Sequence, residues 1–474
     1  MPRDPTARFK ANDAQGLAAA EVLVPEEHLA RQVLKLMERV EVSQVEAQYS
    51  ALGQRGYPPR RLLSLWVYAS LIGLHHATKL AHALVTDAAL RLLAGGHVIS
   101  RPVLNRFRMS HAALFRSALE ATVQWALEEG LVDAQGLAVD SARLRAHASM
   151  QQVRVLNRST RRLEQLAEVD TSVLSEQERA KHQQKVDKHT QAVELCTQAQ
   201  AASVVLTSKA AALMQFPGEV YLPGHRLTVT ASGAQSRLVV GVLINAAPND
   251  TSLLEEAVLQ ARQVLRQAGL PSVVRLQAAA DAGYWSQADL AFAAANTGWV
   301  DLLIKQKAES GPLRGKNYFG RDAFQLLSPE QVLCPVGKRM LGPKRHQQGA
   351  LLYRGDGCAT CPKHSACTPS KRRSLVVNWD YEKLGAQMRQ RMSQQDAPAR
   401  YHQRMATVEP VFSSLEDGMG FRRVSSRKPQ TVSAEILLKL LAYNVSRLLT
   451  RRRLLCVYFL LPLSTSTDQP SSEF

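Results

Sequence analysis

Three acidic residues stand where a metal-dependent enzyme would carry its ligands. Asp281 directly follows the apolar run 273–280, and Asp140 follows a shorter β-like run, 137–139. Two carboxylates brought close together repel each other unless a divalent cation neutralises them, and hard oxygen ligands suit Mg²⁺ or Mn²⁺. Glu409 lies in a segment with a helical pattern and could supply the third ligand. We therefore expect a site for Mg²⁺ or Mn²⁺ formed by these three residues.

A plainer interpretation exists for each acid taken singly. Asp140 and Asp281 could cap the ends of strands, and Glu409 could be a surface residue of a helix. Tyr401 and Arg404 should lie on the same helix as Glu409. Pro410 is unfavourable there, because the residue before a proline is biased away from helical angles, so we expect a kink.

The elements around the two aspartates predict a mixed α/β sheet. Asp140 and Asp281 are each expected at the end of a strand in this sheet. Alternation of apolar and polar residues indicates strands, and a 3.6-residue stripe indicates helices. Along the chain the expected elements are a hairpin of strands at 225–231 and 237–247, a helix at 249–270, a strand at 273–281, a helix at 286–298 and a strand at 299–306.

The first part of the chain, 27–131, has a helical pattern throughout and predicts a small helical domain. One of its helices begins with a capping-type serine and a proline in the first turn. This helix places Asn105, Arg106 and Arg108 in one surface region, as a DNA-reading helix would. Basic residues on a solvated helix face are equally common, so both interpretations stay open.

A charged segment follows the Asp140 run. Residues 150–202 are rich in Gln, Glu, Lys and Arg, with a break where Ser175 and Glu178 form a capping-box pattern. Two charged helices in a hairpin fit this segment. It is either a solvated insertion or an arm that grips DNA or mediates dimerisation.

The charge of the whole chain indicates a polyanionic partner. The 474 residues carry a formal net charge of +18, and 45% of them are hydrophobic, as in a globular protein. Nucleic acid is the first candidate partner and an anionic membrane surface the second. The N-terminus lacks the apolar core of a secretory signal, and the apolar run 454–463 is about half the roughly 20 residues of a spanning helix. We expect a soluble, cytoplasmic protein associated with the nucleoid, with no membrane partner.

Four of the six cysteines fall in one stretch. Cys334, Cys358, Cys361 and Cys367 are spaced C-x23-C-x2-C-x5-C. Such a set could form a tetrahedral thiolate site for a structural Zn²⁺ that holds together a polar insertion, or it could be four reduced cysteines without metal. The spacing leaves both open.

The three acidic segments together resemble a known family. The stretches "VDSARLRAHAS", "DAGYWSQADL" and "YHQRMATVEPVFSSLEDGMGFRRVSSR" are similar to the catalytic blocks of bacterial insertion-sequence transposases of the DDE class, those with a ribonuclease H-like catalytic core. The similarity extends to "GYPPRRLLSLWVYASLIG", to "RLLAGGHVISRPVLNRFR" and to "PND" at 248–250, and so spans residues 58–453.

The resemblance implies a role for each matching residue. Asp140, Asp281 and Glu409 would hold two Mg²⁺ or Mn²⁺ ions, which activate water or a DNA 3′-hydroxyl and stabilise the leaving oxygen of a phosphodiester. Tyr401 and Arg404 match a tyrosine-arginine signature and would contact the DNA backbone, since arginine holds phosphate oxygens well.

The chain departs from the family pattern at two positions. Glycine commonly follows the first aspartate, whereas this chain has Ser141. Lysine commonly stands seven residues after the glutamate, whereas this chain has Glu416, so that phosphate contact is in doubt. Arg422 and Arg423 could replace it.

We therefore expect an α/β protein: a ribonuclease H-like mixed-sheet core with a helical N-terminal domain and a helical insertion. Its function would be metal-dependent DNA cleavage and strand transfer at the terminal inverted repeats, by a homodimer on double-stranded DNA. A nuclease of the same fold and an inactive, transposase-derived DNA-binding protein are the alternatives. The expected segments are a helical DNA-binding domain at 1–132, the first strand of the core at 133–149, a helical arm at 150–205, the continued core at 206–310, the cysteine insertion at 311–380, the glutamate helix and C-terminal helices at 381–453, and a tail at 454–474.

Overall fold

The computed structural model describes residues 8–50, 54–247, 252–306 and 318–460. The chain divides into two compact units. The first contains residues 1–248, 257–272 and 405–474, and the second contains residues 249–256 and 273–404. This division is coarser than the expected segments, because the N-terminal helices share a unit with the strands between residues 137 and 245. The "PND" motif at 248–250 lies outside the described residues.

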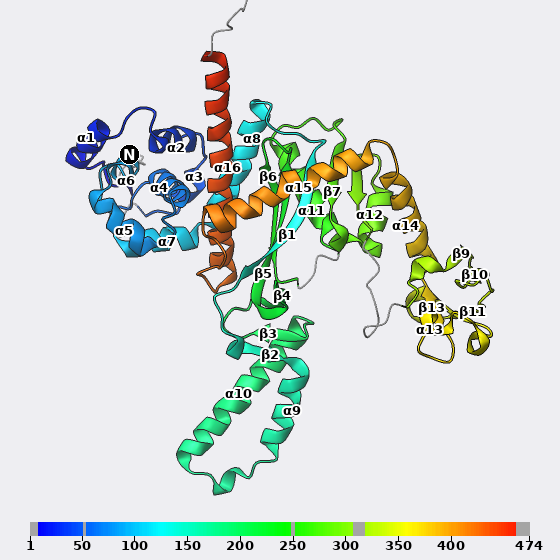
Figure 1. The fold of residues 1–474 in the computed structure, drawn as a ribbon. Coiled ribbons are helices and arrows are strands. Elements are labelled where there is room, and N and C mark those ends of the chain that lie inside the picture. Colours follow the sequence, from blue (N-terminus) through cyan, green and yellow to red (C-terminus); the bar gives the residue numbers. More distant parts are fainter. Residues whose placement is uncertain (1–7, 51–53, 248–251, 307–317, 461–474) are drawn as a thin grey trace, which may run out of the picture. The chain divides into compact units, whose positions relative to one another are not determined.

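The N-terminal part of the first unit is helical, as its sequence pattern predicts (Figure 1). Its helix α4 is buried almost all round, which explains its lack of a polar face. Trp66 lies inside this core and donates a hydrogen bond from its indole nitrogen to the Leu104 carbonyl at 3.2 Å. The helices are α1 Ala14–Leu23, α2 Leu29–Met37, α3 Ser43–Glu46, α4 Pro59–Leu71, α5 Ala77–Thr86, α6 Ala88–Leu93, α7 Arg101–Ser110 and α8 Ala112–Glu128.

An antiparallel group of strands forms the centre of the first unit. β5 Val220–Ser232 pairs with β1 Leu137–Arg145, with β6 Leu238–Asn245 and with β4 Ala212–Phe216. The predicted hairpin of 225–231 and 237–247 is thus confirmed as β5 and β6. The register between these two strands shifts after Thr230, which is a β-bulge.

The long C-terminal helix α16 Pro429–Leu460 stabilises the first unit. It packs against α4, α7 and α8, and its apolar residues from Val432 to Leu449 are buried in the same core as those helices. The buried Asn444 side chain bonds to both the N–H and the carbonyl of Val239 on β6, each at 2.9 Å. The helix extends six residues past the start of the tail expected at 454–474, and residues 461–474 lie outside the described part.

A helical hairpin separates β1 from β4. Figure 1 shows α9 Leu156–Ala167 and α10 Glu176–Gln198 side by side, joined at their base by the short paired strands β2 Val153–Val155 and β3 Ser203–Val205. The capping box is confirmed: Ser175 and Glu178 bond each other's backbone N–H groups.

The second unit contains a parallel strand pair. β7 Leu276–Ala280 pairs with β8 Val300–Ile304, and the crossover between them is α12 Gln287–Ala295. α14 Trp379–Met392 packs on β8. α15 Ala397–Ser413 begins in this unit and continues into the first, and α11 Leu254–Gln267 lies mostly in the first. Antiparallel and parallel strands with these helices confirm the predicted mixed α/β class.

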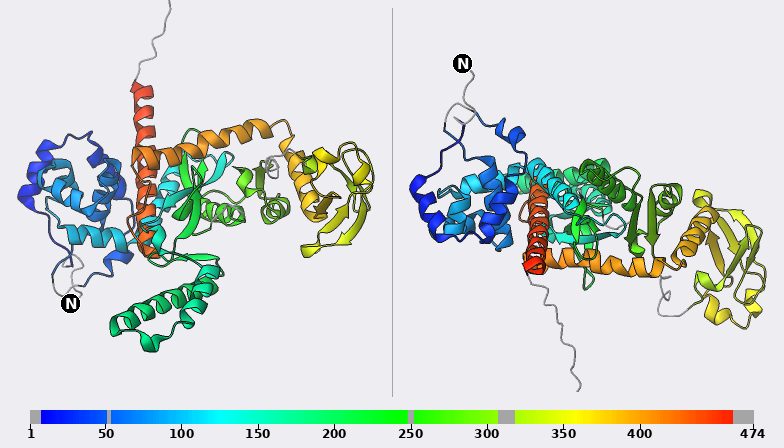
Figure 2. Two further views of the ribbon diagram at one scale, coloured as in Figure 1. Left: turned by 60° about the horizontal axis from the view of Figure 1, so that its bottom comes forward. Right: turned by 90° about the horizontal axis from the view of Figure 1, so that it is seen from above.

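The cysteine segment folds as two small antiparallel sheets beside α14 (Figure 2). Their common core is small and consists of Phe324, Val332, Met340, Tyr353, Leu375 and Val377. The sheets consist of β9 Gln325–Ser328 with β10 Gln331–Leu333, and of β11 Leu341–Arg345, β12 Leu351–Arg354 and β13 Ser374–Val377, and one short helix, α13 His364–Cys367, follows β12. Short 3-10 helices occur at Met150–Gln152, Thr171–Val173, Arg321–Ala323, Gln347–Gly349 and Cys358–Thr360.

Candidate active site

Asp140 lies within β1 and not at its end. The prediction that the strand stops at Asp140 is wrong, because β1 continues to Arg145 and pairs with β5 along its whole length. Asp140 is half-buried, and its Oδ1 accepts a hydrogen bond from the N–H of Ser141 at 2.8 Å. The Ser141 hydroxyl bonds to the hydroxyl of Thr228 on β5 at 2.8 Å. The serine that departs from the family pattern thus links the two strands.

Asp281 stands directly after β7, as predicted. It is also the N-cap of the 3-10 helix Ala282–Tyr284: its Oδ1 accepts from the N–H of Gly283 at 2.8 Å. The capping interpretation is therefore correct for this aspartate. It does not exclude the ligand interpretation, since a carboxylate has two oxygens and about four lone-pair positions.

Glu409 lies on α15, together with Tyr401 and Arg404, as predicted. Its side chain is exposed. The helix continues through Pro410 to Ser413 and is followed directly by a π-helical turn, Ser414–Gly418. Since proline removes one N–H from the helix ladder, an irregular turn close by is the expected consequence.

The three acids are described in different units. Asp140 and Glu409 belong to the first unit, and Asp281 belongs to the second. Within the described residues, no group of three or more His, Cys, Asp or Glu side chains is arranged to hold a metal ion.

Tyr401 and Arg404 form a local pair in the second unit. The Tyr401 ring packs against Ala279 of β7 and Leu303 of β8, next to Ala397. The Arg404 guanidinium lies 5.9 Å from the centre of this ring, and Arg404 is 9% exposed. The strand pair that leads to Asp281 thereby fixes where these two side chains lie.

An arginine-rich loop lies along the end of β1 in the first unit. The backbone at Arg145 bonds to Arg422 and Val424, so that Arg423 pairs with β1 as one extra strand residue. Arg423 donates from its Nε to the Ala146 carbonyl at 3.2 Å, and Arg422 forms an exposed ion pair with Asp417 at 2.6 Å. The exposed basic residues of this surface, which we call the arginine loop surface, are Arg143, Arg145, Arg422, Arg423 and Arg427.

A buried acid on α16 anchors this loop. Glu435 accepts hydrogen bonds from the N–H groups of Ser425 and Ser426, at 2.9 to 3.1 Å, and from the Ser425 hydroxyl. Lys439, one turn further along, bonds to the Ser70 hydroxyl at 3.3 Å and to His75. Burial lowers the pKa of Lys439 to about 7, against the opposing charge of Glu435.

The predicted helix that carries Asn105, Arg106 and Arg108 is present as α7, but these residues differ in exposure. Arg106 is exposed and Asn105 is half-buried. Arg108 is 8% exposed: it donates to the His75 carbonyl at 3.1 Å and lies over the Trp66 ring. Arg108 therefore serves the packing of the helical part, which corrects its assignment to a DNA-reading surface.

Two features of the second unit have no signal in the sequence. Asp301 on β8 receives hydrogen bonds from Arg391 at 2.5 and 2.9 Å and from Arg400 at 2.7 Å, and both arginines also bind Asp396. Burial would raise the pKa of Asp301, but these hydrogen bonds outweigh it and lower the pKa. The partners lie about ninety residues apart in the chain, too far for spacing to indicate the contact.

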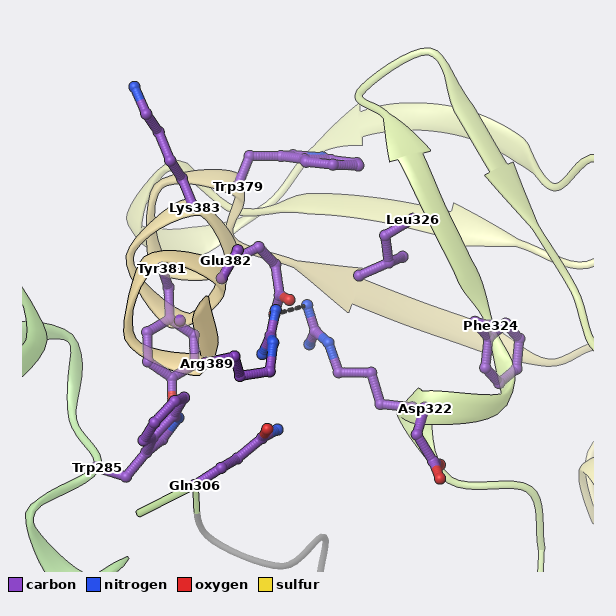
Figure 3. Close-up of a pocket in the computed structure, with 13 residues that line it drawn as sticks. Trp285, Gln306, Asp322, Phe324, Leu326, Trp379, Tyr381, Glu382, Lys383 and Arg389 are labelled. Carbon is purple, nitrogen blue, oxygen red and sulfur yellow. Dashed lines mark ion pairs between the residues drawn. The ribbon is translucent and has the colours of Figure 1, made fainter. Parts of the chain in front are cut away.

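The other feature is a cavity of about 770 Å³ shown in Figure 3. Trp285, Trp379 and Tyr381 line it together with the cations Lys383 and Arg389. Arg321 and Glu382 also line the cavity, and they form an ion pair of 2.7 Å, drawn as the dashed line in Figure 3. Aromatic faces beside cations are a surface on which nucleic-acid bases stack.

Comparison with known proteins assigns the chain. The family described as transposase DDE domain matches residues 333–449. A second family, described as transposase domain (DUF772), matches residues 18–110. Both matches support the resemblance to DDE transposases seen in the sequence, which is thereby confirmed. Of the three acids expected to bind metal, only Glu409 lies inside a matched segment.

The structural comparison is weaker. The cryo-EM structure of a piggyBac transposase synaptic complex with hairpin DNA matches with a TM-score of 0.31 and 8% sequence identity, over 97% of this chain and 84% of that one. None of the curated proteins compared with the chain is significantly similar to it. Within the described residues, no helix has the length and apolar character needed to cross a membrane.

Proposed function

We propose that this chain is a DNA transposase that cleaves the ends of an insertion sequence and joins them to target DNA. The observation that carries the proposal is the match to two transposase domain families, one over residues 18–110 and the other over residues 333–449, which include Glu409. Asp140, Asp281 and Glu409 are proposed as the catalytic acids, supported by their places in β1, after β7 and on α15.

The three carboxylates fit a hard divalent cation by their chemistry. They supply only oxygen ligands, which Mg²⁺ and Mn²⁺ prefer. Within the described residues no group of three such ligands is arranged to hold a metal ion, and the proposal therefore rests on the chemistry of the three carboxylates and on their places in the fold. Two ions bound there would lower the pKa of an attacking water and stabilise the leaving oxygen of the phosphodiester.

The remaining side chains of the proposed site would position DNA. Arg404 is proposed to bind phosphate oxygens, for which a guanidinium is well suited; because it is buried beside the Tyr401 ring, its side chain would have to turn outward to do so. The arginine loop surface adds exposed cations next to the strand that carries Asp140. Arg106 and Asn105 of α7 are proposed to contact DNA separately, and a homodimer would hold two element ends.

The proposal is tested by incubating the full chain with Mg²⁺ and a supercoiled plasmid that carries the flanking inverted repeats. We expect cuts at the repeat ends and joined products, which Asp281→Asn abolishes. Glu256→Gln, an exposed acid on α11, is the matched control and should retain both. Cutting without joining would identify a nuclease, and repeat binding without cutting would identify a DNA-binding protein; either result would overturn the proposed function.

A further inference from the structure

The four clustered cysteines come together in the folded chain. Cys334, Cys358, Cys361 and Cys367 all line one cavity of about 30 Å³ in the cysteine insertion. None of them forms a disulfide. This volume holds one ion or one water molecule and no larger ligand. Four thiols from separate turns around so small a space are the ligand set of a structural zinc site.

Two tight turns present three of the thiols, and the fourth, Cys367, ends the short helix α13. In the first, the Cys334 N–H bonds to the Lys338 carbonyl and the Gly337 N–H bonds to the Cys334 carbonyl, both at 2.8 Å. In the second, the Cys361 N–H bonds to the Cys358 carbonyl at 3.2 Å. Gly337 has a φ of +79°, which favours glycine at this position.

A second glycine leaves room for a thiol. A Cβ atom on Gly355 would lie 2.4 Å from the Cys358 sulfur, closer than any real contact. Any larger residue at this position would push Cys358 away from the cavity. Glycine at position 355 therefore leaves the space that the Cys358 sulfur occupies.

The charge around the cavity suits thiolates. Four thiolates on one Zn²⁺ carry a net charge of −2, and Lys338, Lys363 and Arg373 also line the cavity.

The insertion has a physical need for such a site. Among its described residues the core has six buried apolar side chains, and Cys334 and Cys367 pack against that core. Domains with so few buried residues commonly depend on a metal or on disulfides for their stability.

We propose that this cavity binds one Zn²⁺ through the thiolates of Cys334, Cys358, Cys361 and Cys367. The thiols line the cavity without yet being arranged around a common point, so the ion would draw the side chains inward. The site is structural, because four protein ligands leave no open position on a tetrahedral ion. It is independent of the proposed Mg²⁺ site in residues, ligand type and purpose.

The test measures zinc in the full chain purified under reducing conditions without added chelator. We expect about one zinc per chain and, after exchange, the visible absorption of tetrahedral cobalt thiolate. Cys361→Ser should lose the metal. Cys196→Ser, which replaces a buried cysteine of α10 outside the cavity, should retain it.

Two further measurements keep the result decisive if Cys361→Ser fails to fold. His364 also lines the cavity, and its Nε2 lies 3.1 Å from the Ser370 carbonyl, so His364→Asn should keep one zinc per chain. Chelation of the native chain should make the insertion sensitive to protease and release four reactive thiols. Zinc-free native protein, four cysteines joined as disulfides, or zinc loss in His364→Asn would each overturn the four-cysteine site.

Discussion

Two aspartates on the neighbouring parallel strands of the second unit have opposite surroundings. Asp301, inside β8, is held by Arg391 and Arg400, and its side chain is only 10% exposed. Asp281, just past the end of β7, caps a short helix through one N–H group. A carboxylate bound by two guanidinium groups stabilises the fold. Asp281, whose carboxylate accepts one backbone hydrogen bond within the described part of the chain, can still bind a cation.

The largest effect on stability is expected where the committed carboxylate is removed. In Asp301→Ala, Arg391 and Arg400 lose the Asp301 carboxylate and keep their ion pairs with Asp396. Breaking a largely buried ion pair costs about 3–5 kcal/mol of stability. Urea denaturation monitored by circular dichroism should show this loss in the free energy of unfolding. A loss below about 1 kcal/mol would contradict the view that the ion pairs of Asp301 stabilise the fold.

Lys439 offers the opposite case, because this buried cation bonds to the Ser70 hydroxyl and to the His75 ring. Its pKa falls from 10.5 in the unfolded chain to about 7, so between these pH values the unfolded chain binds the extra proton and stability rises with pH. Lys439→Met should flatten this rise and stabilise the chain at pH 7 by about 1 kcal/mol or more. Thermal unfolding from pH 7 to pH 10 measures both effects, and an unchanged slope would contradict them.

Acid should remove part of what Asp301 contributes. Because its folded pKa lies below the ordinary value of 3.8, the stabilisation is complete above about pH 4 and is lost as pH falls through the folded pKa. The native chain should therefore lose more stability than Asp301→Ala between pH 4 and pH 2. Parallel acid titrations followed by tryptophan fluorescence make the comparison, and equal losses would show that the ion pairs do not depend on this carboxylate.

The smallest effect is expected at the arginine loop surface. Arg423→Ala removes one exposed cation and should reduce the dependence of DNA affinity on salt by about one unit of slope, without changing sequence preference. Fluorescence anisotropy with labelled DNA at several salt concentrations measures the slope. The control is Lys79→Ala, which removes an exposed lysine of α5 outside this surface. An equal reduction of the salt dependence in this variant would contradict a specific role of the arginine loop surface in DNA binding.

The sequence predicted elements better than it predicted contacts. The β5–β6 hairpin, the β7–α12–β8 unit and the position of Asp281 follow from local periodicity, and the structure has all of them. The predicted end of β1 is too early. Arg143 and Arg145 are exposed and Leu144 between them is buried, which is the alternation of a strand that continues.

Long-range contacts explain what local patterns could not show. Arg108 looks like a surface cation on α7, but the Trp66 ring and the His75 carbonyl, both distant in sequence, draw it inside. The ion pairs of Asp301 likewise join segments with no common motif. By contrast, the close spacing of the cysteines in the insertion can be read from the sequence, and in the folded chain all four line one cavity.

The central claim, that Asp281 is a metal ligand, is tested most directly by changing the ligand and then the metal. We predict that Asp281→Cys cleaves the plasmid at the repeat ends very poorly with Mg²⁺ and recovers with Mn²⁺, because the softer ion accepts a sulfur ligand more readily. The matched control is Glu256→Cys, which changes an exposed acid and should cleave equally well with both ions. Asp289→Cys is unsuitable, because Asp289 is buried and accepts hydrogen bonds from the Ser286 hydroxyl and from the N–H groups of Ser252 and Leu254. Full activity of Asp281→Cys with Mg²⁺, or a folded variant that neither ion restores, would contradict the account.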